Sequence, residues 1–298
     1  MAILLTAQTR VLAVNATGAY GGAQVRFMRE FGTQVVAHVA SGRPEPVQGL
    51  PTFPTIAAAV AATGATAAAI FTPAPGVRDS VEEAAEAGLG LAFAAAEFVP
   101  LHDALRAAER ARAVGLWLVG PNSSGIATPG QAVLGALPPG FTSPGRVGVI
   151  GRSGTLTMNV CRSLSLAGIG QSSVVHVGGD VICGRNPHEW LRLFMEDRGT
   201  DAVVYLGEPG GSKEYALAQE VSRAVKPVVV LVVGRQVPQR KRMGHAGALV
   251  GAEHETAAAK CDALAAAGAH VARHIPDIVT LLQTLAGKPT GAVQESAA

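Results

Sequence analysis

The 298-residue chain is poor in charged and aromatic residues, and each shortage excludes a class of protein. Lys, Arg, Asp and Glu make up 15% of the residues and hydrophobic residues 48%, so the chain can bury a sizeable core and is not a disordered protein. The net charge is +2, which gives no reason to expect nucleic acid or a membrane surface as a partner. Aromatic residues make up only 4%, so we expect a core of Ala, Val, Leu and Ile.

Long apolar runs and paired cysteines are also missing. The longest apolar runs, such as Val228–Val233, are far shorter than the ~20 residues of a membrane-spanning helix. The start, MAILLTAQTR, lacks the basic and apolar regions of a signal peptide. Cys161, Cys183 and Cys261 are widely separated and form no CxxC motif, which favours reduced thiols over disulfides or a zinc site. We therefore expect a cytoplasmic protein.

Two series of short apolar runs alternate with helical, Ala-rich stretches. The first series lies at residues 10–15, 32–39, 65–73, 90–97 and 115–122, and the second at 147–151, 172–178, 202–208, 227–234 and 270–274. Strands separated by helical patterns of ~10–15 residues indicate βαβ units and parallel sheets. Because the strands are apolar throughout, we expect both faces of each sheet to be covered.

The segment 125–146 separates the two series and holds four prolines and five glycines. This composition is typical of a linker, which can include a small hairpin. We predict two consecutive α/β domains with parallel sheets, at residues 1–124 and 147–286. A frayed tail would follow at 287–298.

Each predicted domain begins with an apolar strand, a Gly-rich turn and a helix start, in VLAVNATGAYGG and VGVIGRSGTLT. Free N–H groups at a helix N-terminus form a general anion site, although such turns also occur without any phosphate. The first turn is not G-x-G-x-x-G, and Arg43 stands near the place where an acidic residue would bind the ribose of NAD. A cation there favours a phosphate ligand, and a solvated arginine is the alternative.

The second Gly-rich turn and the strand 202–208 offer a second set of polar groups. Ser153, Gly154 and Thr155 lead a predicted helix whose N-terminus can hold a phosphoryl group. Ser153 can also be a simple N-cap, and the two interpretations are compatible. Glu208 ends its strand at the edge where α/β sheets place ligands. Its carboxylate can hold an imidazole nitrogen, or it is a turn residue before Pro209.

His245 differs from the other histidines because glycines flank it in RKRMGHAGALVG. Gly244 and Gly247 permit positive φ and a close approach of other groups. A histidine in such a loop, preceded by cations, suits transient acceptance of a phosphoryl group as a nucleophile. No HxxH, HExxH or CxxC spacing accompanies it, so we predict no metal site. The missing G-x-S-x-G argues against a Ser–His–Asp hydrolase.

Taken in order, the motifs resemble the alpha-subunit family of succinyl-CoA synthetase (succinate–CoA ligase) over about residues 5–286. The resemblance rests on TGAYG, GPNSSGIATPG, GRSGTLT, VGGD, GEPGGS and KRMGHAGA. It implies a Rossmann-like CoA-binding domain followed by a flavodoxin-like ligase domain. It also implies that His245 is transiently phosphorylated, that Glu208 orients it, and that the helix starting at Ser153-Gly154-Thr155 holds the phosphohistidine.

The resemblance further implies ligands and a partner. The CoA phosphates would lie near Thr17, Gly18, Ala19, Tyr20 and Arg43, and the pantetheine near Ala95, Ala96 and Glu97. ATP or GTP, with Mg, would bind to a separate ATP-grasp beta subunit in an αβ or (αβ)2 heteromer, since nothing in this chain resembles an ATP-grasp domain. The phosphoryl group would pass from the nucleotide to His245 and then to a carboxylate, and the CoA thiol would attack the acyl phosphate.

Departures from the family pattern concern the acid and the CoA loop. Met158 replaces the tyrosine that follows SRSGTLT in the family, and Asn122 lies in GPNSSG where the family has GPNCPG. We expect Met158 and Asn122 at the substrate. The loss of a phenol hydroxyl suits a bulkier or less polar acid, so succinate, malate, itaconate, citrate and other carboxylates stay open. Arg43, followed by PEP, replaces the lysine and glycines of the CoA loop.

Two other classes of function remain as alternatives. A CoA-binding paralogue without activity would not need to retain Ser153, Glu208 and His245 together. A dinucleotide-dependent oxidoreductase would need the glycine fingerprint and the ribose-binding acid, which are both missing.

Overall fold

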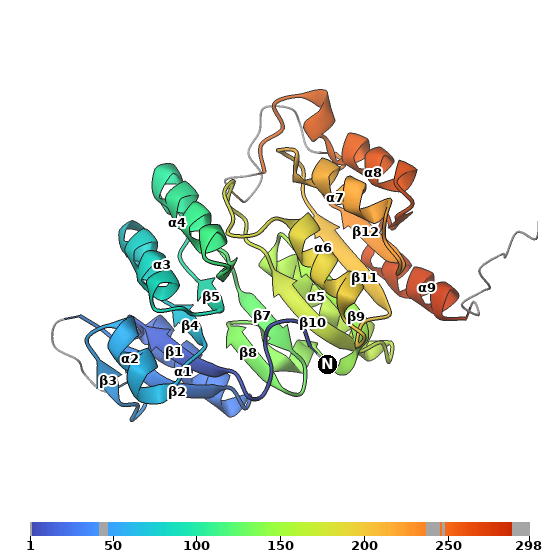
Figure 1. The fold of residues 1–298 in the computed structure, drawn as a ribbon. Helices are drawn as coiled ribbons and strands as arrows, with labels where there is room; N and C mark the ends of the chain where they lie inside the picture. Colours follow the sequence, from blue (N-terminus) through green and yellow to red (C-terminus); the bar gives the residue numbers. More distant parts are fainter. Residues whose placement is uncertain (1, 42–46, 237–244, 246–247, 288–298) are drawn as a thin grey trace, which may run out of the picture.

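The computed structural model describes residues 2–41, 47–236, 245 and 248–287, which form two α/β units lying side by side (Figure 1). Arg43, the residues next to His245 on both sides and, except for Gly287, the predicted tail at 287–298 lie outside these residues. No helix in the described ranges has the length and apolar character needed to cross a bilayer.

The first unit is built on a parallel sheet with the strand order β3-β2-β1-β4-β5-β6. Its strands are β1 Arg10–Val14, β2 Gln34–Val39, β3 Thr52–Phe53, β4 Ala67–Ile70, β5 Leu91–Ala94 and β6 Trp117–Val119. Numbered along the chain, this is the order 3-2-1-4-5-6 of the doubly wound Rossmann sheet. The predicted Rossmann-like domain is therefore confirmed.

Helices cover both faces of the first sheet, as the apolar strands predicted. They are α1 Ala19–Glu30, α2 Ile56–Thr63, α3 Val77–Glu86 and α4 Leu101–Ala113, with a short 3₁₀ turn at Ala74–Gly76. One face packs with α2, α3 and α4 in a core of its own. The opposite face, next to α1, shares a continuous core with the second unit. The two units are thus not independent bodies.

The second unit holds a mixed sheet with the strand order β13-β12-β11-β9-β10-β7-β8. Its strands are β7 Gly125–Thr128, β8 Ala132–Gly135, β9 Pro144–Gly151, β10 Gln171–His176, β11 Ala202–Gly207, β12 Val228–Val232 and β13 His270–Val271. The parallel part, β9 to β13, has the flavodoxin-like order 2-1-3-4-5. The predicted fold class is confirmed here too, and an antiparallel hairpin extends the parallel strands.

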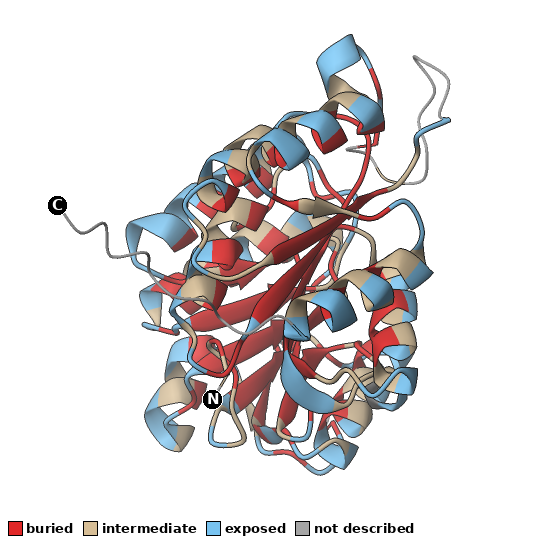
Figure 2. Ribbon diagram, turned by 90° about the vertical axis from the view of Figure 1, so that its right-hand side faces the viewer, coloured by how far each residue is buried: buried red, intermediate tan, exposed pale blue. Residues whose placement is uncertain are grey.

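Two layers of helices enclose this sheet, and Figure 2 shows its buried strands between half-exposed helices. The helices are α5 Gly154–Leu166, α6 Pro187–Glu196, α7 Lys213–Val221, α8 Ala257–Ala266 and α9 Ile275–Ala286, with 3₁₀ turns at Pro139–Phe141 and Glu253–Glu255. Helix α5 packs with α9, while α6, α7 and α8 pack in sequence.

The segment 125–146, expected to be a linker with room for a small hairpin, forms the β7–β8 hairpin and the start of β9. Strand β7 pairs with β10, so the hairpin is the edge of the second sheet. Its other side contacts the first unit, where Thr33 Oγ1 donates to Val133 O over 2.8 Å. Two of the glycines that indicated a linker are required by close packing: a Cβ on Gly125 would lie 2.0 Å from Leu134 O, and one on Gly135 would lie 2.5 Å from Ser124 O. The exact domain boundaries stay a prediction.

A second contact between the units involves both tryptophans of the chain. The ring of Trp117 on β6 lies 4.9 Å from that of Trp190 on α6. Arg185 stacks on Trp117 at 4.7 Å and donates to Leu116 O. Arg112 on α4 forms an ion pair with Glu189, whose carboxylate also bonds to the N-cap backbone of α6. These contacts fix the start of α6 against the first sheet.

Candidate functional site

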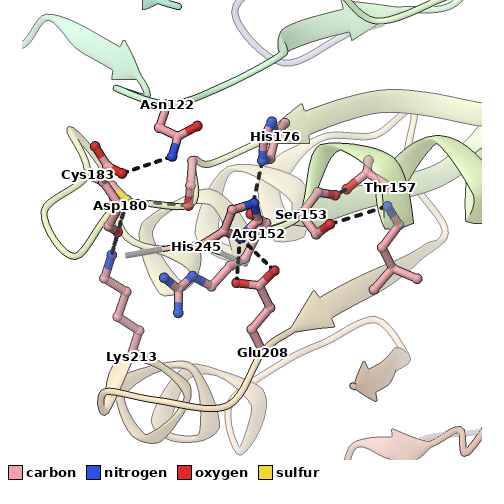
Figure 3. A network of polar contacts seen from close by, with 12 residues as sticks. Asn122, Arg152, Ser153, Thr157, His176, Asp180, Cys183, Glu208, Lys213 and His245 are labelled. Atoms are coloured by element: carbon pink, nitrogen blue, oxygen red, sulfur yellow. Dashed lines mark hydrogen bonds and ion pairs between the residues drawn. The ribbon is translucent and has the colours of Figure 1, made fainter. Parts of the chain in front are cut away.

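The polar residues singled out in the second half of the sequence gather at the carboxyl ends of neighbouring strands (Figure 3). Ser153 follows β9, Asp180 follows β10 and Glu208 follows β11. Ligands of open α/β sheets bind at this edge because loops and helix N-termini converge there. The topology therefore brings together residues that are up to 55 positions apart.

His245 lies against the carboxylate of Glu208. Its Nδ1 is 2.9 Å from Oε1 and 3.0 Å from Oε2, and the Glu208 side chain is only 7% exposed. The hydrogen bond to Glu208 raises the pKa of His245, while burial opposes this shift. With Nδ1 held by a carboxylate, Nε2 is the ring nitrogen that can act as a nucleophile.

Gly179 gives the His245 ring the space it occupies. A Cβ at Gly179 would lie 2.6 Å from His245 Cγ and 2.9 Å from Nδ1. Backbone and ring cannot both keep their places with a side chain there. The second glycine of the VGGD motif, Gly179, is therefore required for steric reasons.

The N-terminus of α5, with Ser153, Gly154 and Thr155, lies beside this pair (Figure 3). Ser153 is the N-cap, and its Oγ accepts from Leu156 N over 3.4 Å. The first backbone N–H groups of a helix have no intrahelical partner and carry partial positive charge. Ser153 is therefore a cap, and the helix start next to it remains available to an anion.

The sequence analysis missed Arg152 and His176, which both belong to this site. Arg152 is 2% exposed, and Figure 3 shows it beside His245 and Glu208. Burial opposes its charge, but Tyr205, Glu214 and Glu208 nearby still raise its pKa. It follows β9 as an ordinary loop arginine does, so the sequence carries no signal of its burial.

His176 is the second residue that was missed, because nothing around it sets it apart from a strand residue. Its Nδ1 accepts from Ser124 N over 2.7 Å, so the ring proton is on Nε2, which donates to Arg152 O at 3.0 Å. Burial lowers the pKa of His176 to about 4. The ring is therefore neutral and ties the Arg152 backbone to the loop that precedes β7.

Asn122 reaches the site through Asp180. Its Nδ2 donates to Asp180 Oδ1 over 2.9 Å, and its backbone N–H donates to Ala96 O over 2.8 Å. It adopts a left-handed conformation, with φ of 54°. The loop of the first unit that carries Ala95, Ala96 and Glu97 is thereby joined to the site of the second.

Met158, the second expected substrate residue, is half-buried on α5 and packs against the core that the two units share. Lys213 is a further polar residue of the site that was not predicted. Its Nζ donates to Asp180 O over 3.3 Å and to Cys183 Sγ over 3.1 Å. Burial lowers the pKa of Lys213.

The first Gly-rich turn borders a cavity of about 410 Å³ at the N-terminus of α1. Thr17, Gly18 and Ala19, which were predicted to lie near the CoA phosphates, line this cavity, and Arg26 adds a cation that the sequence analysis did not identify. Gly18 caps α1 without a side-chain hydrogen bond, so the N–H groups of this turn are open to a ligand. Tyr20 is 56% exposed and its ring meets the edge of Phe71.

A larger cavity of about 720 Å³ lies at the opposite edge of the second sheet, between Pro144 and Ala286. Its charged lining residues, Arg146 and Asp201, form an exposed ion pair with each other. The candidate site is therefore the cluster of polar residues at the carboxyl ends of β9, β10 and β11, and not this cavity. No group of three His, Cys, Asp or Glu in the described part of the chain is placed to hold a metal ion.

Comparisons with known proteins agree with this architecture. Residues 6–98 match the family model of the CoA binding domain, and residues 150–270 match that of the CoA-ligase. Subunit alpha 1 of succinate–CoA ligase (ADP-forming) from Archaeoglobus fulgidus is 41% identical over 94% of this chain and 96% of its own. The corresponding alpha subunit from Aquifex aeolicus is 38% identical over 91% of this chain and 90% of its own.

Solved structures share the fold at lower identity. ATP citrate lyase from Methanothrix soehngenii, in complex with citrate and coenzyme A, gives a TM-score of 0.86 at 24% identity over 99% of this chain. A dinucleotide-forming acetyl-coenzyme A synthetase from Ca. Korarchaeum cryptofilum, in complex with phosphate and ADP, gives 0.77 at 21% identity over 95%. This chain spans only 53% and 61% of those two chains.

A CoA-binding Rossmann-like unit, followed by a flavodoxin-like unit with a histidine on a buried carboxylate, defines the class of acid–CoA ligase subunits. Within that class, the chain belongs to the succinate–CoA ligase alpha-subunit family. The family resemblance predicted from the motifs is confirmed.

Proposed function

We propose that the chain is the alpha subunit of a nucleotide-dependent, NDP-forming acid–CoA ligase that makes an acyl-CoA from a dicarboxylate through a phosphohistidine at His245. The observation that carries the proposal is the contact of His245 Nδ1 with the carboxylate of Glu208, next to the N-terminus of α5. The ADP-forming succinate–CoA ligase alpha subunits among its relatives support the dicarboxylate and the nucleotide.

In the first half-reaction, Nε2 of His245 attacks the terminal phosphorus of the nucleotide, and the bond to the leaving NDP breaks. Glu208 accepts a hydrogen bond from Nδ1–H, which fixes the tautomer and stabilises the positive charge that develops on the ring. The N–H groups at the start of α5 then face the transferred phosphoryl group. Arg152 lowers the pKa of His245 slightly, which favours the neutral, nucleophilic ring.

In the second half-reaction, a carboxylate oxygen of the acid attacks the phosphohistidine, and the P–N bond breaks. The product is an acyl phosphate, whose phosphate is a good leaving group where the original carboxylate oxygen was a poor one. The CoA sulfur then attacks the acyl carbon and inorganic phosphate departs, which gives the acyl-CoA. CoA would bind along the cavity at Thr17, Gly18 and Arg26, with its pantetheine reaching past Ala96 toward Asn122.

The proposal includes a partner. ATP or GTP, with Mg, would be bound by an ATP-grasp beta subunit in a cytoplasmic αβ or (αβ)2 heteromer. The relatives named as alpha subunits of succinate–CoA ligase support a separate partner.

Phosphorylation with labelled nucleotide tests the proposal. The chain and a candidate beta subunit are incubated with γ-labelled ATP or GTP, and protein-bound label is measured after acid and after base. We expect an acid-labile, base-stable label that His245→Ala abolishes and that the exposed control His254→Ala retains. A wild-type pair that takes no label from either nucleotide would instead indicate a CoA-binding paralogue without activity.

The acid is tested on the same αβ pair by phosphate release with CoA, nucleotide and a panel of carboxylates. Met158 supports an acid that is bulkier or less polar than succinate. We expect Met158→Tyr to shift the preference toward succinate, as a ratio of kcat/KM values. If wild type already prefers succinate clearly, the assignment of Met158 to specificity is wrong.

A further inference from the structure

A row of three buried polar side chains lies directly beneath Glu208. Tyr205 on β11, Glu214 on α7 and Lys260 on α8 are each 0% exposed. Tyr205 Oη donates to Glu214 Oε1 over 2.7 Å, and Lys260 Nζ lies 2.6 Å from Glu214 Oε2. The row therefore links three elements by one hydrogen bond and one ion pair.

Lys260 continues the row to the loop that carries Glu208. Its Nζ donates to Glu208 O over 2.9 Å and to Gly210 O over 2.6 Å. The ammonium donates two hydrogen bonds to carbonyls of this turn, and its charge is balanced by the Glu214 carboxylate in the ion pair. The ammonium thus holds the backbone of the turn on both sides of Pro209.

A buried ammonium costs free energy unless its partners are well placed, and an apolar pair of similar volume often stabilises a core equally well. Stability alone does not explain why the ammonium group donates both of these hydrogen bonds to the turn that carries Glu208. The turn has one task that depends on position: it aims the Glu208 carboxylate at His245 Nδ1. An error of about 1 Å in such a contact is enough to slow a reaction ~100-fold.

We propose that Lys260, itself held by Glu214 and Tyr205, is a positioning residue that fixes the Glu208 turn so that the carboxylate meets His245. The inference rests on the proposed role of His245 and extends it to residues that touch neither substrate nor the reacting ring. The alternative is a purely structural role, in which the row only joins α7 and α8 to the sheet.

The chain offers a matched control for this alternative. Lys226 donates from Nζ to Phe194 O and Asp197 O, both over 2.6 Å. It therefore also ties two backbone carbonyls, but at the C-terminus of α6, at the opposite edge of the sheet. Lys226→Met removes a similar tether without touching the turn at Glu208.

The decisive comparison uses Glu214→Gln and the double variant Glu214→Gln/Lys260→Met. Both lack the Glu214 charge, and only the first retains the donors to Glu208 O and Gly210 O. The readouts are the pKa of His245, from an NMR titration of the ring nitrogens in the full chain, and the rate of His245 phosphorylation in the αβ pair.

We expect the double variant to bring the His245 pKa down toward its ordinary value and to slow phosphorylation about 10–100-fold relative to Glu214→Gln, with the apparent nucleotide affinity unchanged. Loss of the Lys260 charge would by itself raise that pKa, so a fall reports lost positioning. Lys226→Met should leave the His245 pKa unchanged and should change the rate of phosphorylation by less than about twofold. An unchanged pKa and rate in the double variant overturn the proposal.

Tyr205→Phe provides a second route if the double variant does not fold, because it removes one hydroxyl and retains the ring. It should move both readouts in the same direction by a smaller amount, and no movement would overturn the proposal. A wild-type pair that takes no label would refute the proposed function, whereas the NMR titration would still test whether Lys260 positions Glu208.

Discussion

At the scale of single residues, the site depends on a position that has no side chain as much as on the polar groups around it. His245 can rest on Glu208 only because Gly179 has no side chain under the ring. We predict that Gly179→Ala displaces His245, because the added Cβ would lie 2.6 Å from its Cγ. Phosphorylation should slow about 10–100-fold, and the His245 pKa should fall toward its ordinary value as the contact with Glu208 is lost.

Labelled-phosphate incorporation and an NMR titration of His245 measure these two effects. The control is Gly140→Ala, since a Cβ at Gly140 would meet no atom within 4 Å. Wild-type labelling in Gly179→Ala would show that the ring does not need this space for the reaction.

His176 makes a prediction about stability and pH. The pKa of His176 is about 4 in the folded protein and ~6.5 in the unfolded chain. Between these two pH values the unfolded state binds a proton at His176 and the folded state does not. Unfolding therefore becomes easier as the pH falls, and this residue accounts for about 3 kcal/mol between pH ~6.5 and ~4.

Urea denaturation of the wild type and of His176→Gln at pH 7, 5.5 and 4.5 measures the contribution of His176 to the pH dependence of the free energy of unfolding. The variant should be less stable at pH 7, because the amide only partly replaces the bonds to Ser124 N and Arg152 O. The stability gap should narrow as the pH falls. Parallel pH profiles would mean that His176 is not a buried neutral ring.

At the scale of elements, the N-terminus of α1 separates ligand binding from folding. Gly18 has an extended backbone with φ of −70°, and a side chain there would meet no atom within 4 Å. Gly18→Asp should stabilise α1 by about 0.5–1 kcal/mol as an N-cap. It should also weaken CoA binding at least about tenfold, because a carboxylate then competes with the CoA phosphates for the same N–H groups.

Calorimetric titration with CoA and thermal unfolding test the two effects on one variant. Gly18→Ser is the matched control, since it caps the helix without a charge and should bind CoA within about threefold of wild type. Labelling of His245 should be unaffected in both variants. Equal CoA affinity in Gly18→Asp and wild type would place the CoA phosphates elsewhere.

The elements that could be predicted from sequence are those whose pattern is local. Uninterrupted apolar runs located the main strands of both sheets to within a few residues, because buried parallel strands need no alternation. The β7–β8 hairpin was not recognised as part of a sheet, since Gly125 and Gly135 resemble loop residues until the close approach of their backbones is known.

The same limit applies to the candidate site. Glu208 and His245 could be paired from the motif resemblance, and the structure brings them together. Arg152, His176, Lys260 and Glu214 could not be found, because their roles depend on burial and on partners far away in the sequence. The role of each site residue stays a prediction for the experiments above.

At the scale of the whole molecule, a shared core and the Trp117–Trp190 contact hold the CoA-binding unit in one orientation to the ligase unit. The proposed reaction needs this fixed orientation at only one step. Phosphorylation of His245 involves the second unit, whereas attack by the CoA thiol requires both units in the correct relative orientation. Loosening the contact should therefore affect the two half-reactions differently.

We predict that Trp117→Leu slows acyl-CoA formation from phosphorylated protein by about tenfold or more and leaves His245 labelling within about twofold of wild type. The variant loses the ring against which Trp190 and Arg185 pack, so Trp190, fully buried in wild type, should show red-shifted fluorescence as the only remaining tryptophan. Stopped-flow assays of each half-reaction measure the split. Val225→Ala, at a residue 82% exposed, controls for the loss of an apolar side chain. If both half-reactions slow equally, the contact supports folding of the second unit, and the orientation of the CoA-binding unit is set by the shared core at the β7–β8 hairpin.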